Sequence, residues 1–117
     1  MSEINKQIKT IYDALMDKKA FDIRIIDISN VSDISDYFII ADGSNRNQVQ
    51  AMCDNVEEFM LQIGKKPKSV EGYADGGWIL LDYYDIIVHI FSDEARRFYD
   101  IERIWSDGRQ IAIEGLA

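Results

Sequence analysis

The residues best suited to chemistry in this sequence are Asp82 and His89, a carboxylate and the only imidazole of the chain. They lie in two apolar runs, Trp78–Tyr83 and Ile86–Phe91, separated by two residues, which predicts a β-hairpin with a two-residue loop. That loop fixes the register of the strands and pairs Leu80 with His89. Asp82 is then a diagonal neighbour of His89, close enough for the carboxylate to orient the ring and favour its protonated form.

Side chains alternate across a strand, so the hairpin predicts two different faces. One face is apolar throughout and must face the core; it carries Ile79, Leu81, Tyr83, Ile86, Val88 and Ile90. The other, called the mixed face here, combines aromatic rings with polar groups; it carries Trp78, Leu80, Asp82, Ile87, His89 and Phe91. A mixed face suits neither bulk water nor a dry core, which makes it the first candidate for function. The alternative is a half-covered sheet face whose polar pair is satisfied internally.

Length and charge narrow the class of protein. A chain of 117 residues is typical of one domain and long enough to bury a core without disulfides or metal. Its 13 Lys and Arg against 21 Asp and Glu give a net charge of −8, which argues against direct nucleic-acid binding driven by phosphate neutralisation. We also expect no direct sequence-specific nucleic-acid contact. A basic partner fits this charge, although taken by itself acidity is explained more simply by solubility.

The single cysteine, Cys53, cannot form an internal disulfide, and no cluster of Cys and His has metal-ligand spacing. We therefore expect a reducing compartment, no metal and no other cofactor. The first residues show neither a signal peptide nor an amphipathic leader, and no apolar run approaches the roughly 18 residues that span a membrane. These features predict a cytoplasmic protein without membrane contact, although an organellar protein lacking its leader would look the same.

Periodicity predicts an α/β domain. Apolar residues at helical spacing predict capped helices at Glu3–Asp17 and Asn45–Ile63. The expected strands outside the hairpin are Ile23–Ile28, Tyr37–Ala41 and Ser69–Gly72, and the expected late helical segments are Asp93–Tyr99, capped by Ser92 or Asp93, and Asp100–Trp105. This order predicts a single mixed β-sheet flanked by helices. We expect one domain at residues 1–107 and a loosely held tail at residues 108–117.

Spaced motifs run through most of the chain, from about Ile11 to Trp105. They are Asp36-Tyr37-Phe38 before a strand, Gly43-Ser44-Asn45-Arg46 before the long helix, Pro67 with Glu71-Gly72, the hairpin segments Trp78 to Tyr83 and Asp85 to His89, Arg97-Phe98-Tyr99, and Ile101-Glu102 to Trp105. With this set of motifs at this spacing, the chain resembles the ribosomal silencing factors, also called the Iojap or YbeB family.

The resemblance implies a nucleotidyltransferase-like α/β fold and a function without catalysis. Family members bind the fourteenth protein of the large ribosomal subunit, uL14, and so sterically block joining with the small subunit. The resemblance therefore implies a translation repressor that binds the large ribosomal subunit. The mixed face and the acidity are both consistent with docking onto a basic protein.

Nine residues are candidates for partner binding. Trp78 and Trp105 are the candidate anchors, because aromatic side chains in partly desolvated patches contribute much of the binding energy of an interface; ordinary core filling is the alternative for both. The acidic candidates, which would pair with Lys or Arg of the partner or else stabilise turns, are Asp82, Asp85 and Glu102. The others are Leu80, His89, Phe98 and Tyr99; of the last two, we expect one to enter the core.

Two other functions stay open. Gly43-Ser44 before a helix is similar to the phosphate-binding turn of nucleotidyltransferases, but the acidic pair that would hold magnesium is absent, so the turn also fits a strand exit and helix cap. A homodimeric interaction module would bury the apolar part of the mixed face instead. Tyr84 stands at the hairpin tip where many family members have glycine. A positive φ is costly for a bulky residue, so we expect another turn geometry or a longer loop there.

Overall fold

In the part of the chain that the structure describes, six strands form one mixed sheet. The structure is a computed structural model, and it describes residues 2–31, 33, 35–98 and 108–113. The helices are α1 (Glu3–Asp17), α2 (Arg46–Gln62) and α3 (Asp93–Phe98), and the strands are β1 (Phe21–Asp27), β2 (Tyr37–Gly43), β3 (Ser69–Glu71), β4 (Trp78–Asp82), β5 (Ile86–Ser92) and β6 (Arg109–Ile111). The strand order is β3-β4-β5-β2-β1-β6. β2 and β5 pair in parallel, and the other neighbours are antiparallel.

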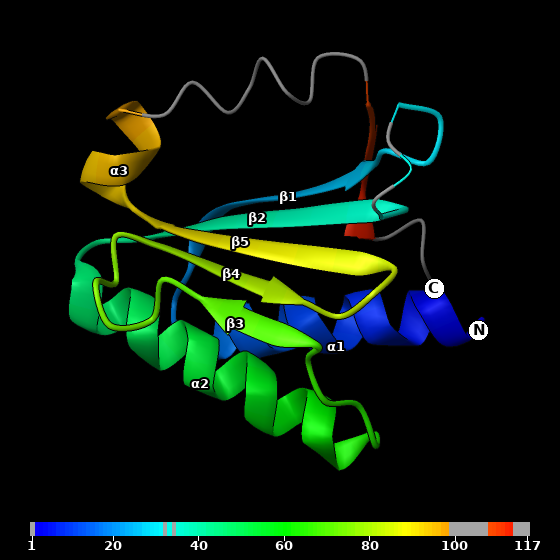
Figure 1. Cartoon of the computed structure of the whole chain (residues 1–117), viewed down its shortest axis with the longest axis horizontal. Coiled ribbons are helices and arrows are strands. Elements are labelled where there is room, and N and C mark those ends of the chain that lie inside the picture. The colour runs from blue at the N-terminus through cyan, green and yellow to red at the C-terminus, as the bar shows by residue number, and fades with distance from the viewer. Residues whose placement is uncertain (1, 32, 34, 99–107, 114–117) are drawn as a thin grey trace.

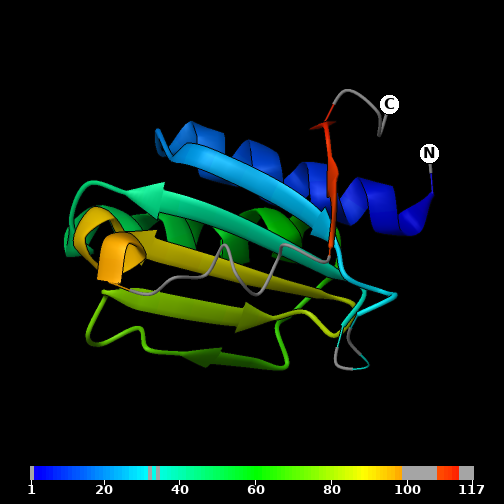
Figure 2. The same ribbon diagram turned by 90° about the horizontal axis from the view of Figure 1, so that it is seen from above.

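The helices lie on both sides of this sheet. α1 and α2 cover one face, and α3 lies on the opposite side (Figure 1). Figure 2 shows α3 at the end of β5, from which it continues directly. The predicted class, a single mixed sheet flanked by helices, is confirmed, whereas the nucleotidyltransferase-like label stays a prediction.

The two long helices follow from their caps and apolar stripes. Ser2 Oγ accepts the backbone N–H of Asn5 at 3.2 Å, and Asn45 Oδ1 accepts that of Gln48 at 2.9 Å, so both helices have the capped start that the sequence predicts. Gly64, with φ +77°, follows the end of α2. The buried stripes that pack on the sheet are Ile8, Ile11, Ala14 and Leu15 from α1, and Val49, Met52, Cys53, Val56 and Met60 from α2.

The predicted loose tail is wrong at its beginning. Arg109–Ile111 forms β6, which pairs with Ile25–Asp27 of β1, and Arg109 Nη2 lies 3.2 Å from Asp27 Oδ2. This strand has three residues and pairs at the edge of the sheet, so it is too short to show a period of two in the sequence. The second late helical segment, Asp100–Trp105, lies outside the described residues.

The hairpin register is confirmed. Leu80 lies opposite His89, and the N–H of Tyr83 donates to the carbonyl oxygen of Ile86 at 2.9 Å. The expectation that the tip avoids a positive φ is wrong, because Tyr84 has φ +73°. The loop is not longer than two residues, and the N–H of Asp85 donates to the carbonyl oxygen of Tyr83 at 3.0 Å, which makes a tight three-residue turn.

Neighbouring groups hold this strained tip in place. Asp82 Oδ1 accepts the N–H of Tyr84 at 2.8 Å. The carbonyl oxygen of Asp85 accepts the Ser35 hydroxyl at 2.8 Å and the N–H of Tyr37 at 3.0 Å. A bulky residue can stay in the left-handed region when its surroundings fix the backbone in this way.

Tyr84→Gly is expected to stabilise the fold. Glycine removes the steric cost of the left-handed backbone, about 1–2 kcal/mol, but loses about 0.5–1 kcal/mol in chain entropy, and the Tyr84 ring contributes little packing because the residue is 62% exposed. We expect a net gain of about 0.5–1 kcal/mol in the free energy of unfolding, measured by urea denaturation. Tyr84→Ala is the control: it removes the ring but keeps the Cβ. An equal gain from alanine would show that the backbone strain is not the cause.

Candidate functional site

The mixed face is the face of the sheet opposite α1 and α2. Strand pairing extends it from the hairpin onto β2, because Phe38 lies beside Ile87 and Ile40 beside His89. On β2, β4 and β5 its members are Phe38, Ile40, Asp42, Trp78, Leu80, Asp82, Ile87, His89 and Phe91. Ile40 and Phe91 are fully buried, whereas Phe38, Trp78, Leu80 and Asp82 keep part of their surface exposed.

Aromatic contacts fix the ring positions on the mixed face. The rings of Trp78 and Phe91 stack with centroids 5.1 Å apart and an interplanar angle of 28°. Phe38 meets the His89 ring edge-on, at 4.7 Å and 75°. Such pairs stabilise a fixed ring arrangement beyond simple burial. Trp78 is therefore held in one orientation while part of its surface remains open to a partner.

His89 is held by Trp78 and not by Asp82, which corrects the predicted contact. Trp78 Nε1 donates to His89 Nδ1 at 3.2 Å, whereas Asp82 Oδ1 turns back to the N–H of Tyr84. His89 is 8% exposed, and burial lowers its pKa to about 4, so the ring is neutral at pH 7 rather than protonated as predicted. Because Nδ1 accepts, the proton lies on Nε2; this atom is buried without a hydrogen-bond partner within the described structure.

Acidification is expected to destabilise the fold through His89. Its pKa is about 4 in the folded protein against 6.5 for the unperturbed group, so the unfolded chain takes up the proton first as the pH falls. The stability that depends on neutral His89 is complete above pH 6.5 and is lost as the pH falls towards 4, by about 3 kcal/mol. Urea denaturation of the wild type and of His89→Asn across this range measures the effect, because the Asn oxygen keeps an acceptor for Trp78.

Comparing the pH dependence of stability in the wild type and in His89→Asn removes the contributions of other titrating groups. Burial raises the pKa of Asp42 to about 6, so Asp42 acts in the opposite direction, its contribution to stability rising as the pH falls. This contribution is common to both proteins and cancels in their difference. Equal pH slopes for the wild type and His89→Asn would show that His89 is not the source.

Carboxylates border the exposed part of the mixed face. Asp82 is partly exposed on β4, and Glu71 of β3, which lies opposite Leu80, is exposed. Asp85 is exposed at the hairpin tip. Negative charge around an aromatic centre favours a basic partner and discourages acidic ones.

The structure brings together four of the nine predicted binding residues: Trp78, Leu80, Asp82 and His89 lie side by side on β4 and β5. Asp85 lies at the tip, beyond the paired strands. Phe98 ends α3, and Tyr99, Glu102 and Trp105 lie outside the described residues, so their roles stay predictions. Phe38 is not among the predicted residues, because the sequence does not show that β2 lies beside β5.

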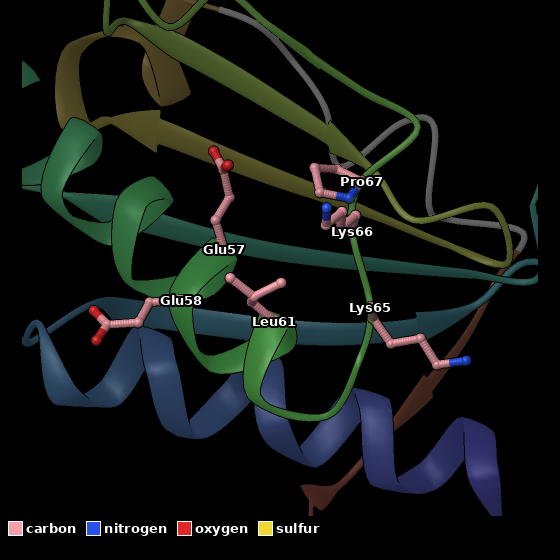
Figure 3. A pocket seen from close by; sticks show the side chains of 6 residues that line it. All are labelled: Glu57, Glu58, Leu61, Lys65, Lys66 and Pro67. Atoms are coloured by element: carbon pink, nitrogen blue, oxygen red, sulfur yellow. The ribbon is translucent and has the colours of Figure 1, made fainter.

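A separate cavity of about 410 Å³ lies on the helix-covered side of the sheet. Figure 3 shows the residues that line it, which are Glu57, Glu58 and Leu61 of α2 and the following Lys65, Lys66 and Pro67. Leu61 is 55% exposed. Charges of both signs surround this leucine, so the cavity favours neither an acidic nor a basic partner. The cavity is the alternative docking site, and binding experiments must distinguish it from the mixed face.

The glycine-serine turn after β2 has a structural explanation. A Cβ on Gly43 would lie 2.9 Å from Val49 Cγ2 and 3.1 Å from Met52 Sδ, so glycine lets α2 pack closely on β2. The N–H of Ser44 donates to Gln48 Oε1 at 2.6 Å. Among the described residues, no group of three or more His, Cys, Asp or Glu is placed to hold a metal ion. The turn therefore fits a strand exit and helix cap.

Fold and site together define a small α/β domain with a candidate protein-docking face of aromatic and acidic residues. None of the helices among the described residues has the length and hydrophobicity that a membrane span requires. The model of a family described as "Ribosomal silencing factor during starvation" matches residues 1–117. The chain belongs to this family of ribosomal silencing factors.

Individual relatives agree with this assignment. The chain is 37% identical over 101 residues to a ribosomal silencing factor of Zymomonas mobilis, covering 86% of this chain and 76% of the relative. It is 33% identical over 103 residues to that of Halalkalibacterium halodurans, covering 88% of each. A crystal structure of a Chromobacterium violaceum protein superposes with a TM-score of 0.86 at 32% identity, covering 95% of this chain and 92% of that one.

Proposed function

We propose that this protein is a non-enzymatic repressor of translation that binds the large ribosomal subunit in the cytoplasm. Its contact there is uL14, the fourteenth protein of that subunit, and the bound protein sterically blocks joining with the small subunit. Membership of the ribosomal silencing factors supports a role at the ribosome. The protein acts by occupying a surface, so the proposal requires a docking face and no catalytic group.

One observation carries the proposal: Trp78 is partly exposed on the mixed face and fixed there by Phe91 and His89. Aromatic anchors in a desolvated centre contribute most to interfaces, and charged residues around them select the partner. Asp82 and Glu71 supply negative charge on the same face of the sheet as the anchor, as a basic ribosomal protein requires.

Sedimentation with ribosomal subunits tests the proposal. Purified protein is mixed with isolated large subunits, sedimented, and then challenged with small subunits. We expect the protein to sediment with large subunits and to lower the fraction of joined ribosomes. A second incubation with isolated uL14 tests the direct contact.

A folded protein that does not sediment with active large subunits would refute the proposal. Sedimentation without blocked joining would refute the steric mechanism alone. If the protein instead forms a dimer that buries the mixed face, its mass in solution will be twice that of one chain, and Trp78→Ala will convert it to a monomer. That result would favour the homodimeric interaction module.

A further inference from the structure

Arg96 of α3 forms a buried ionic contact with two different strands. It is 7% exposed; its Nη1 pairs with Asp42 Oδ1 of β2, and its Nη2 lies 3.3 Å from Asp22 Oδ2 of β1. The planar guanidinium suits such a double contact, because its donors diverge in a fixed fork. α3 has six residues and is too short to be stable without tertiary contacts. The contact ties this short helix to the centre of the sheet.

The backbone of β1 is distorted where Asp22 reaches Arg96. The pairing of β1 with β2 shifts register between Phe21 and Arg24, as at a β-bulge, and Asp22 has a positive φ of +51°. Bulges turn a side chain in a new direction, and strained backbone persists only where the surroundings hold it. Asp22 also accepts Arg24 Nε at 3.2 Å. The distortion thus places one carboxylate between two arginines.

Asp42 is held in an environment that disfavours its charge. It is 4% exposed, and desolvation raises its pKa to about 6 although Arg96 acts to lower it. Buried ion pairs are often no more stabilising than apolar replacements of similar volume, so stability alone is a weak explanation of this arrangement. Fixing one geometry is the better attested use of buried ionic groups.

The helix that Arg96 fixes packs on the mixed face near Phe91. Ala95, next to Arg96, packs against the buried cluster of Ile26, Ile28, Ile40 and Phe91, and Trp78 packs against the same cluster. The N–H of Ala95 donates to Ser92 Oγ at 3.2 Å, which caps the start of α3. The position of α3 is therefore coupled to the position of Trp78 through this shared cluster.

We propose that Arg96 is a positioning residue for docking: by pairing with Asp22 and Asp42 it fixes α3 on the sheet and so holds the Phe91–Trp78 pair in its docking arrangement. The link to docking rests on the proposed function, whereas the fixing of α3 does not. Loss of the contact loosens α3 and Trp78 locally while the layer formed by α1 and α2 stays folded.

Hydrogen exchange measured by NMR tests the local part. In Arg96→Met we expect amide exchange in α3 and exchange of the Trp78 indole N–H to speed up about tenfold or more, with amides of α1 and α2 unchanged. Arg24→Met is the matched control, because it removes a guanidinium that also pairs with Asp22 but leaves α3 attached. Arg96→Lys should lie between the two, since a lysine keeps the charge without the fork. Uniform acceleration in all helices would mean a purely structural role, and unchanged exchange in α3 would refute the contact's role.

Sedimentation with large subunits tests the link to docking. We expect Arg96→Met to bind about tenfold more weakly and Arg24→Met to bind like the wild type. If Arg96→Met does not fold, Asp22→Asn is the milder variant, because the Asp22 side chain is 43% exposed and Asp42 stays paired with Arg96. Asp22→Asn should also speed up exchange in α3 and weaken binding to large subunits. Wild-type protein that fails to bind would overturn the proposed function while leaving the exchange result valid. Local loosening with unchanged binding would overturn the positioning role alone.

Discussion

Trp78→Ala is expected to weaken binding to large ribosomal subunits by roughly 30-fold, or about 2 kcal/mol, the size typical of an interface hot spot. The partly exposed Trp78 ring is stacked on Phe91 and bonded to His89, so it meets a partner already ordered and loses little side-chain entropy on binding. Alanine removes both the contact surface and the donor to His89. Titration of large subunits with labelled protein, followed by sedimentation, measures the dissociation constant.

Two variants separate this effect from general damage. Leu61→Ala removes an exposed apolar side chain at the α2 cavity, on the other side of the sheet, and should leave binding unchanged. Trp78→Phe keeps an aromatic ring but no indole N–H, so it should recover part of the affinity. A folded Trp78→Ala protein that binds like the wild type would show that Trp78 is not an anchor, and weaker binding by Leu61→Ala alone would move the docking site to the cavity.

The sequence predicted best what depends on local pattern. The pairing of Leu80 with His89 was predicted from a short loop between two apolar runs, and the structure confirms it. Both long helices have the predicted capped start, with Ser2 and Asn45 as the N-caps. These features need only neighbouring residues, so periodicity and capping determine them.

The errors arise where tertiary contacts outweigh local preference. Tyr84 keeps a positive φ because Asp82 and the loop around Asp85 hold the turn. The same use of the Asp82 carboxylate breaks the predicted contact with His89, whose acceptor is instead satisfied by Trp78. The spacing of two residues in a hairpin predicts that they lie close together, but it does not determine from which of several nearby donors a carboxylate accepts a hydrogen bond.

The parts of the site that were missed come from distant segments. Asp42 and Arg96 lie 54 positions apart in the chain and meet because β2 lies beside β5, from which α3 continues. Phe38 joins the mixed face for the same reason. Strand order in a mixed sheet is a property of the whole fold, and no periodicity in one sequence reports it.

Gly72→Ala is expected to destabilise the fold by about 3 kcal/mol or more, among the larger effects of a single substitution. Gly72 follows β3 with φ +80°, and a Cβ there would lie 2.2 Å from the carbonyl oxygen of Trp78. The left-handed backbone alone accounts for about 1–2 kcal/mol, and the clash with backbone adds to it, because a carbonyl in β4 cannot turn away as a flexible side chain can. Urea denaturation measures the loss in the free energy of unfolding, with the dependence of that free energy on urea concentration expected to stay unchanged.

Gly64→Ala is the matched control for this prediction. Gly64 has nearly the same φ, +77°, but a Cβ there meets nothing within 4 Å, so only the conformational cost of about 1–2 kcal/mol remains. The difference between the two variants therefore isolates the close approach of Gly72 to Trp78. Since that approach sets where β4 begins, folded Gly72→Ala protein should also bind large subunits more weakly, whereas Gly64→Ala should bind normally. Equal destabilisation by both variants would show that β4 shifts easily, and that the position of Trp78 does not depend on Gly72.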